Sequence, residues 1–178
     1  MSEDVLPLGR KHPSSSRRLR VLFLCTHNSA RSQIAEALFA RKGGDRFTVA
    51  SAGSAPARRV HPLAVEALAD LRIDWSTRTP KGIDDVKREP WDLIITVCDR
   101  ARESCPTFPH QPAFAHWSME DPTEAQGEAA QRRAFRETIT YLSRRIDLLL
   151  ALPFESLERS ALERRARDLG RLPSRDAE

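Results

Sequence analysis

The chain has 178 residues, of which 40% are hydrophobic and 30% charged, as expected for one globular domain. No segment reaches the roughly 18 apolar residues of a membrane span, and the N-terminal stretch lacks the apolar run of a signal peptide. We therefore expect a cytoplasmic protein. Three cysteines without a secretion signal argue against a structural disulfide framework and favour metal-binding or catalytic roles.

The net charge of +4 raises the question of nucleic-acid binding. Much of the excess positive charge, however, lies near the N-terminus, on Arg10, Lys11, Arg17, Arg18 and Arg20. We interpret residues 1–18 as a flexible, solvated basic arm. The sequence therefore predicts neither a nucleic-acid partner nor a membrane partner.

The first predicted element is a strand, because residues 21–25 read VLFLC without polar interruption. Such a run is typical of a strand in a parallel sheet that is covered on both faces. A polar turn follows, and residues 29–42 then have apolar side chains at helical spacing before Gly43 and Gly44 end the helix. The order strand, loop, helix is typical of an α/β protein.

Strands and helices continue to alternate along the chain. We expect strands at 47–50, 91–98 and 113–117, a helix at 61–74 that starts with Pro62, and a long amphipathic helix at 128–152. This order predicts an α/β fold, a single domain over 19–152 with a parallel four-stranded sheet and helices on both faces. Residues 153–178 form a charged C-terminal extension, either a short helix or a frayed end.

The most informative stretch is CTHNSARS, which starts at Cys25 after the first strand and leads into the helix. A loop that wraps into a helix N-terminus points backbone N–H groups at one centre, where a tetrahedral anion fits. Arg31 can then hold two oxygens of that anion. The residues expected to bind the oxyanion are Thr26, His27, Asn28, Ser29, Ala30 and Arg31.

Cys25 is the predicted nucleophile. The helix N-terminus and the Arg31 guanidinium should lower the pKa of its thiol, and Ser32 can donate its hydroxyl to the thiolate. Asn28 tolerates the left-handed backbone conformation that tight anion loops need. A buried cysteine at a strand end, followed by an ordinary arginine at a helix start, would give the same spacing without catalysis.

This stretch resembles the phosphate-binding loop of low-molecular-weight protein tyrosine phosphatases and of their relatives, the thioredoxin-coupled arsenate reductases. Further matches follow in the same order: SQIAEALFA after the loop, SAGS at 51–54, VHPLAVEAL at 60–68 and WDLIITVCD at 91–99. The resemblance covers residues 19–152. One departure is Ala30, where some of these reductases have another cysteine.

The departing oxygen of a phosphoryl or arsenyl group needs a proton, and Asp121 is the candidate general acid. Proline at 122 favours extended backbone for Asp121, and a nearby bound anion would raise the pKa of this carboxyl and keep it protonated. A plain Asp-Pro turn is the alternative. The resemblance supports the acid, because the family's catalytic aspartate lies in such a pair. Phosphatases of the family commonly have tyrosine next, whereas this chain has Thr123.

Cys98 ends the third predicted strand and should share the crevice at the strand ends with Cys25. Cys105 lies seven residues later. If the segment is helical, their Cα atoms are about 10 Å apart, beyond the roughly 7 Å that a disulfide allows, so a bond requires refolding. Two other interpretations stay open: small buried hydrophobic residues, or a zinc site with His110 or His116, although the C-x-x-C spacing of such sites is missing.

The resemblance implies arsenate reduction through a thiol relay. Cys25 attacks arsenate, Cys98 attacks Cys25 as arsenite leaves, and Cys105 then forms a disulfide with Cys98 that thioredoxin reduces. Glutathione with glutaredoxin is the alternative reductant. No tightly bound cofactor is expected, and a monomer is favoured. Some relatives bind potassium beside the loop, and the matching positions here are Asn28, Glu36 and Ser51.

Two other functions remain open. Phosphate and arsenate are nearly isosteric, so a low-molecular-weight protein tyrosine phosphatase acting on phosphate monoesters is the first alternative. A non-catalytic oxyanion sensor is the second.

Overall fold

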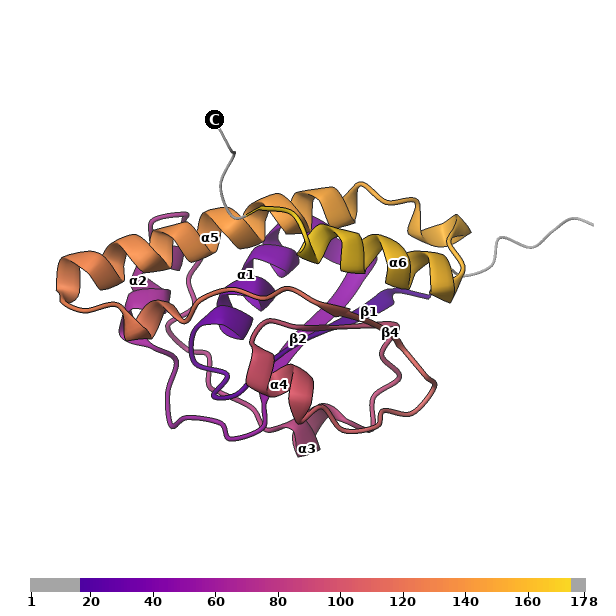
Figure 1. Cartoon of the computed structure of the whole chain (residues 1–178), viewed down its shortest axis with the longest axis horizontal. Coiled ribbons are helices and arrows are strands. Elements are labelled where there is room, and N and C mark those ends of the chain that lie inside the picture. The colour runs from indigo at the N-terminus through magenta and orange to yellow at the C-terminus, as the bar shows by residue number, and fades with distance from the viewer. Residues whose placement is uncertain (1–16, 174–178) are drawn as a thin grey trace, which may run out of the picture.

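The computed structural model describes residues 17–173 and contains a parallel sheet with helices around it (Figure 1). The strands are β1 (Leu19–Cys25), β2 (Phe47–Gly53), β3 (Leu93–Thr96) and β4 (Ala113–His116). The α-helices are α1 (Arg31–Gly43), α2 (Pro62–Ala69), α3 (Ile83–Val86), α4 (Asp99–Glu103), α5 (Glu128–Leu150) and α6 (Arg159–Gly170). Short 3-10 turns lie at η1 (Gly44–Arg46), η2 (Pro122–Glu124) and η3 (Phe154–Ser156).

The strand order in the sheet is β2-β1-β3-β4, and all neighbouring pairs are parallel. After β1 the chain forms β2 on one side of it and then crosses to β3 on the other side. Ligands of open α/β sheets bind where the connections diverge in this way, beyond the carboxyl ends of the strands. The predicted four-stranded parallel sheet is confirmed, and the loop after β1 lies at this point.

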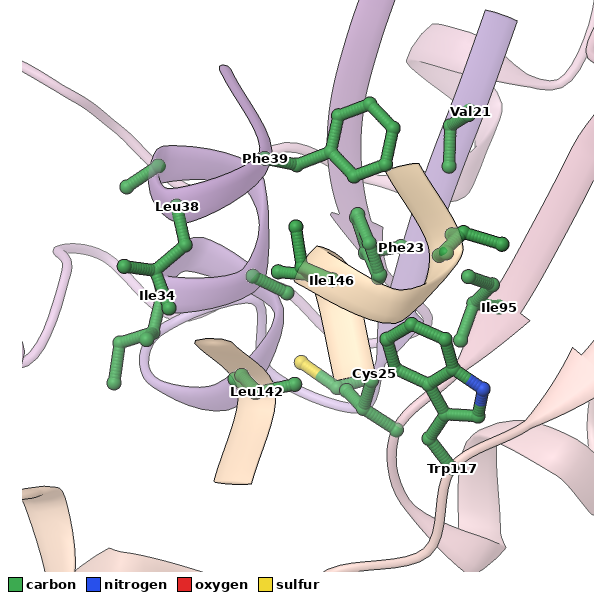
Figure 2. Packing of buried hydrophobic residues seen from close by; sticks show 14 of the residues in the cluster. Val21, Phe23, Cys25, Ile34, Leu38, Phe39, Ile95, Trp117, Leu142 and Ile146 are labelled. Atoms are coloured by element: carbon green, nitrogen blue, oxygen red, sulfur yellow. The ribbon is translucent and has the colours of Figure 1, made fainter. Parts of the chain in front are cut away.

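Alternate side chains of β1 enter two cores. Val21, Phe23 and Cys25 face the larger one, which packs under α1 and α5 (Figure 2). Leu22 and Leu24 face a smaller cluster on the other side of the sheet. Both faces are therefore covered, which explains why the run VLFLC has no polar interruption. The smaller cluster is completed by Ala52, Val86, Trp91, Ile94 and Phe108.

Some element boundaries differ from the prediction. The helix expected at 61–74 ends at Ala69, because Arg72 adopts a left-handed conformation (φ 59°) and the N–H of Ile73 turns back to the Leu68 carbonyl. Strand β2 continues to Gly53 because its whole length pairs with β1. Sheet pairing is a tertiary contact that residue-by-residue patterns do not contain.

The C-terminal extension contains helix α6, which packs against β4. Leu162 and Ala166 of α6 are buried, and the Trp117 indole N–H donates to the Ala166 carbonyl (2.9 Å). Side chains of α6 also form hydrogen bonds with the backbone of the edge strand β4. Glu163 accepts from the N–H of Phe114 (3.2 Å), and Arg167 donates to the Phe114 carbonyl (3.1 Å). Helix α6 thus covers the backbone that an edge strand would leave unpaired.

We expect α6 to contribute to the stability of the domain. Leu162→Ala should lower the free energy of unfolding by about 2–3 kcal/mol, since it opens a cavity at a buried site. Leu148→Ala removes the same atoms from an α5 side chain that is 41% exposed, and should cost less than about 1 kcal/mol. Urea denaturation of both variants measures the difference. Equal losses would mean that α6 is not part of the cooperative core.

Arg17 and Arg20, two of the basic residues near the N-terminus, have acidic partners on the folded domain. Arg20 lies within β1, pairs with Glu89 and stacks over the Trp91 ring, while Arg17 pairs with Asp92. Both acidic partners come just before β3, so these contacts lie at the amino-terminal ends of the two central strands. Arg10 and Lys11 lie outside the described residues. Within 17–173, none of the helices combines the length and hydropathy needed to cross a bilayer.

Candidate active site

The loop between β1 and α1 is shaped by contacts with the segment after β2. In a trans peptide the carbonyl of one residue and the N–H of the next point in opposite directions. Four carbonyls of the loop point outward, toward the segment after β2. The N–H groups that follow them therefore turn toward the interior of the loop, as an anion site requires. The carbonyls of Cys25, Thr26, His27 and Ser29 accept from the N–H groups of Ser54, Ala55, Ala57 and His61.

Two backbone positions make this loop conformation accessible. Asn28 has φ of 48°, the left-handed conformation expected from the sequence. At Gly53 a Cβ atom would lie 2.5 Å from the Thr26 carbonyl oxygen, so only glycine allows β2 to end so close to the loop. Thr26, Asn28 and Ala30 are buried, Ser29 is half-buried, and His27 is exposed at the mouth.

Cys25 is 4% exposed, and its Sγ lies 2.8 Å from Ser32 Oγ and accepts from the N–H of Asn28 (3.1 Å). Burial raises the pKa of the Cys25 thiol, and the hydrogen bonds from Ser32 and Asn28 offset this only in part. The expected lowering of this pKa is therefore wrong for the free protein. The main physical reason is the burial of the thiol, and the Arg31 guanidinium is paired with Asp121.

Arg31 instead pairs with the predicted general acid. Its Nη2 donates to Asp121 Oδ2 at 2.9 Å, and its Nη1 donates to the Met119 carbonyl at 3.1 Å. The loop and Asp121 are thus brought together although they lie 90 residues apart in the chain. The Asp121 carboxylate thus occupies one side of the Arg31 guanidinium.

Asp121 has the extended backbone expected before proline (φ −78°, ψ 113°). Burial by itself would raise the pKa of this carboxyl, but hydrogen bonds from Thr123 and the charges of Arg31 and His27 outweigh it, so the pKa is lowered. The expected protonation of Asp121 depends on a bound anion beside the carboxyl, and it stays a prediction.

Cys98 lies just after β3, beside the loop, with its Sγ 3.5 Å from Thr26 Oγ1. It is 5% exposed and caps α4, accepting from the N–H of Ala101 (3.4 Å). Cys105 lies beyond α4, half-buried against the smaller core cluster. All three cysteines are free thiols, and α4 separates the last two.

The zinc alternative finds no support in the contacts of His116. Its Nδ1 lies 2.8 Å from Thr96 Oγ1, and its Nε2 lies 2.9 Å from Asp99 Oδ1, so both ring nitrogens have partners other than sulfur. Within residues 17–173, no group of three or more histidine, cysteine or acidic side chains is arranged to hold a metal ion.

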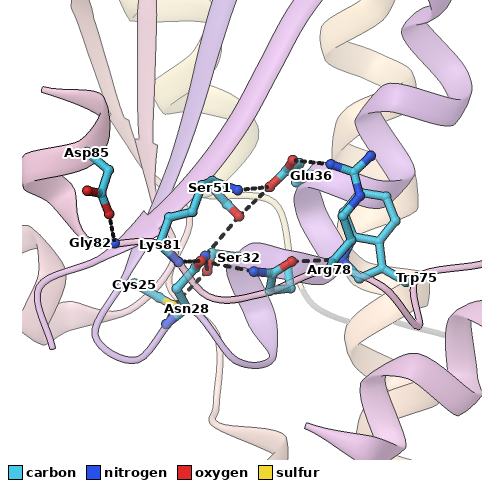
Figure 3. A network of polar contacts seen from close by, with 11 residues as sticks. Cys25, Asn28, Ser32, Glu36, Ser51, Trp75, Arg78, Lys81, Gly82 and Asp85 are labelled. Carbon is cyan, nitrogen blue, oxygen red and sulfur yellow. Dashed lines mark hydrogen bonds and ion pairs between the residues drawn. The ribbon is translucent and has the colours of Figure 1, made fainter. Parts of the chain in front are cut away.

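The three residues expected near a monovalent cation do lie together (Figure 3), but their contacts do not fit one. Asn28 turns its NH₂ group to Ser51 Oγ (2.8 Å), and Ser51 donates to Glu36 (2.5 Å). The charge of buried Glu36 is met by Lys81 Nζ at 3.4 Å and Arg78 at 3.9 Å. The chain itself thus supplies the positive charge that a bound cation would bring.

Sequence reasoning missed Gln33, Trp75 and Lys81, which support the loop from behind. Gln33 is a fully buried polar residue of α1, and Trp75 and Lys81 come from the connection between α2 and α3. A polar side chain at 33 among the apolar residues of the predicted helix was the available signal, since buried polar groups need partners. The identity of those partners was not readable from the chain.

Comparison with known proteins agrees with this geometry. The family model described as low molecular weight phosphotyrosine protein phosphatase matches residues 20–163. An arsenate reductase from Halalkalibacterium halodurans is 38% identical over 127 residues, 71% of this chain and 91% of the relative.

Two solved structures show the same fold. An arsenate reductase from Archaeoglobus fulgidus is 32% identical, with a TM-score of 0.57 over 71% of this chain and 98% of that chain. A thioredoxin-dependent arsenate reductase from Corynebacterium glutamicum is 35% identical, with a TM-score of 0.58 over 75% of this chain and 60% of the other. The chain therefore belongs to the low molecular weight phosphotyrosine protein phosphatase family and, within it, to the group formed by the arsenate reductases.

Proposed function

We propose that this chain reduces arsenate to arsenite through a relay of Cys25, Cys98 and Cys105. The observation that carries the proposal is the position of Cys98, whose thiol lies beside the anion loop, 3.5 Å from Thr26 Oγ1. Hydrolysis of a phosphate ester needs one thiol at this loop, whereas reduction of arsenic needs a second thiol to supply electrons. The names of the relatives support arsenate as the substrate.

In the first step, arsenate displaces Asp121 from Arg31 and is held by the loop N–H groups and the guanidinium. The Cys25 proton passes to the bound arsenate dianion, and Ser32, 2.8 Å away, stabilises the thiolate. The thiolate attacks arsenic and forms an S–As bond. Asp121, protonated once the anion lies beside it, gives its proton to the departing oxygen, which leaves as water.

In the second step, the Cys98 thiolate attacks Cys25 Sγ. The S–As bond breaks and its electron pair stays on arsenic, so As(V) becomes As(III) and arsenite leaves as the Cys25–Cys98 disulfide forms. Cys105 then attacks Cys98 and releases the Cys25 thiolate. Because α4 lies between Cys98 and Cys105, this exchange requires α4 to unwind, which exposes the final disulfide to a reductant.

Thioredoxin is the proposed reductant, since a structural relative is named as thioredoxin-dependent. Glutathione with glutaredoxin is the alternative. The chemistry requires free thiols and therefore a reducing compartment, and we place the protein in the cytoplasm. No bound cation takes part in the proposal, because Lys81 and Arg78 already face Glu36.

The test is a coupled assay in which the full chain reduces arsenate and the oxidation of NADPH is followed. The coupling system is either thioredoxin with thioredoxin reductase or glutathione with glutaredoxin and glutathione reductase. We expect turnover with the first pair. Turnover only with the glutathione system would replace thioredoxin as the proposed reductant, and arsenate would remain the proposed substrate. Inactivity with both, together with Cys25-dependent hydrolysis of an aryl phosphate, would contradict the proposal and identify a phosphatase.

A further inference from the structure

A chain of hydrogen bonds runs from Trp75 to the Cys25 thiol through buried polar side chains (Figure 3). The Trp75 indole N–H donates to Gln33 Oε1 (2.7 Å), and Gln33 Nε2 donates to Asn28 Oδ1 (2.9 Å). Asn28 Nδ2 donates to Ser32 Oγ (2.8 Å), which lies 2.8 Å from Cys25 Sγ. Trp75 is 4% exposed, and the three residues that link it to Cys25 are fully buried.

The direction of these bonds follows from which groups are able only to donate. An indole N–H has no acceptor capacity, so Trp75 requires the oxygen of the Gln33 amide to face it and the NH₂ to face Asn28. The Asn28 oxygen therefore faces Gln33, and its NH₂ faces Ser32. Ser32 Oγ accepts that bond, which leaves its single proton for Cys25 Sγ.

A second donor acts in the same sense. The backbone N–H of Lys81 donates to Asn28 Oδ1 at 2.8 Å, so Asn28 is held by two donors, of which Gln33 is the one that can reverse. If the Gln33 amide turned over, its oxygen would face the Asn28 oxygen at the distance of a hydrogen bond. The Trp75 N–H prevents this, because the reversed amide would then place an NH₂ against it.

We propose that Gln33 and Trp75 are positioning residues that fix the Asn28 amide and thereby direct the Ser32 hydroxyl proton onto Cys25 Sγ. The inference rests on Cys25 being the nucleophile of the proposed function. It adds that Trp75, which lies 50 residues from Cys25 in the sequence, influences the reactivity of the Cys25 thiol. Both residues act through Asn28 and Ser32, to which their hydrogen bonds lead.

Other charges near Cys25 need to be separated from this effect. Cys98 disfavours the Cys25 thiolate by like charge, while Arg31 is held by Asp121, with His27 beside that carboxylate. None of these groups contacts Gln33 or Trp75 through the bonds described. A change of Cys25 reactivity in variants at 33 or 75 therefore reports on the hydrogen-bond chain.

The experiment is alkylation of the full chain by iodoacetamide over a range of pH, with each cysteine quantified by peptide mass spectrometry. Trp75→Phe keeps a ring under Arg78, which stacks 4.4 Å from the Trp75 ring, and removes the N–H. Gln33→Met removes both hydrogen bonds of the Gln33 side-chain amide, to Trp75 and to Asn28. We expect the apparent pKa of Cys25 to rise by about half a unit to one unit in each, about three- to tenfold slower alkylation at neutral pH.

Trp91→Phe is the matched control, since Trp91 is 3% exposed and donates to the Val86 carbonyl (2.8 Å) on the other face of the sheet. It should leave the Cys25 profile unchanged, and Cys98 and Cys105 should keep their profiles in all variants. Native profiles in folded Trp75→Phe and Gln33→Met would overturn the inference, as would an equal shift in Trp91→Phe. Failure of both variants to fold would overturn it too, because the pair would then serve the whole fold.

This readout does not need arsenate turnover. If the native chain fails to reduce arsenate, the proposed function fails, and the alkylation profiles still decide whether Trp75 controls the thiol.

Discussion

Serine at each of the three cysteines is expected to stop arsenate reduction at a different step. Cys25→Ser removes the attacking sulfur and should lower turnover by about 10⁴-fold or more, with no arsenite formed. Cys98→Ser should allow arsenate to react with Cys25 but release no arsenite, because no second thiol attacks the adduct. Cys105→Ser should release one arsenite per chain and stop as a Cys25–Cys98 disulfide.

Quenched reactions with a stoichiometric count of arsenite, followed by intact mass measurement, distinguish these outcomes. Ser104→Ala is a suitable control, because it removes the hydrogen bond from Ser104 to the Arg100 carbonyl at the end of α4 without removing a thiol. It should retain multiple turnover. Full multiple turnover in Cys98→Ser or Cys105→Ser would rule out the relay and favour an external thiol acting directly on the Cys25 adduct.

Asp121→Asn is expected to change catalysis and anion binding in opposite directions. Loss of the proton donor should lower kcat by about 10²–10⁴-fold. Phosphate, a stable mimic of the substrate, should bind about tenfold more tightly, since the neutral amide neither repels the anion nor competes for Arg31 with a full charge. Turnover assays and isothermal titration with phosphate measure the two effects.

Thr123→Val is the matched control for this prediction. It keeps the Asp121 carboxylate and removes the hydroxyl that donates to Oδ1 at 2.7 Å, so the pKa of Asp121 should move up from its lowered value. Both kcat and phosphate affinity should then stay close to the native values or rise slightly. Weaker phosphate binding in Asp121→Asn would show that the Arg31–Asp121 pair supports the loop and does not compete with the substrate.

Helix α6 and Arg20 of β1 illustrate where local reasoning stops. The pattern around Leu157, Leu162 and Leu169 left open whether the C-terminal extension is a helix or a frayed end. The helix is set by burial against β4 and by the bonds of Glu163 and Arg167 to the strand edge. Arg20 likewise read as part of an arm, because its partner Glu89 is 69 residues away. The predicted domain boundaries at 18 and 152 remain predictions.

The sequence alone was sufficient for the parallel α/β fold and for the loop from Cys25 to Ser32, because both depend on short-range information. An apolar run of strand length, a turn at Asn28 and a helix start at Arg31 are neighbours in the chain, so their order already implies backbone N–H groups converging on an anion. The rule that parallel strands end at one edge of the sheet placed Cys98 in the same crevice as Cys25, whereas the role of Asp121 came from its Asp-Pro pair and from the family resemblance.

Only the tertiary structure decided the electrostatic state of the site. The pairing of Arg31 with Asp121, the ammonium of Lys81 beside Glu36 and the bond from Trp75 to Gln33 join segments that lie 42 or more residues apart, and the raised pKa of Cys25 comes mainly from burial in the folded core. A pKa depends on which charges and dipoles lie within a few ångströms and on how much water is excluded, and these quantities exist only after the chain has folded.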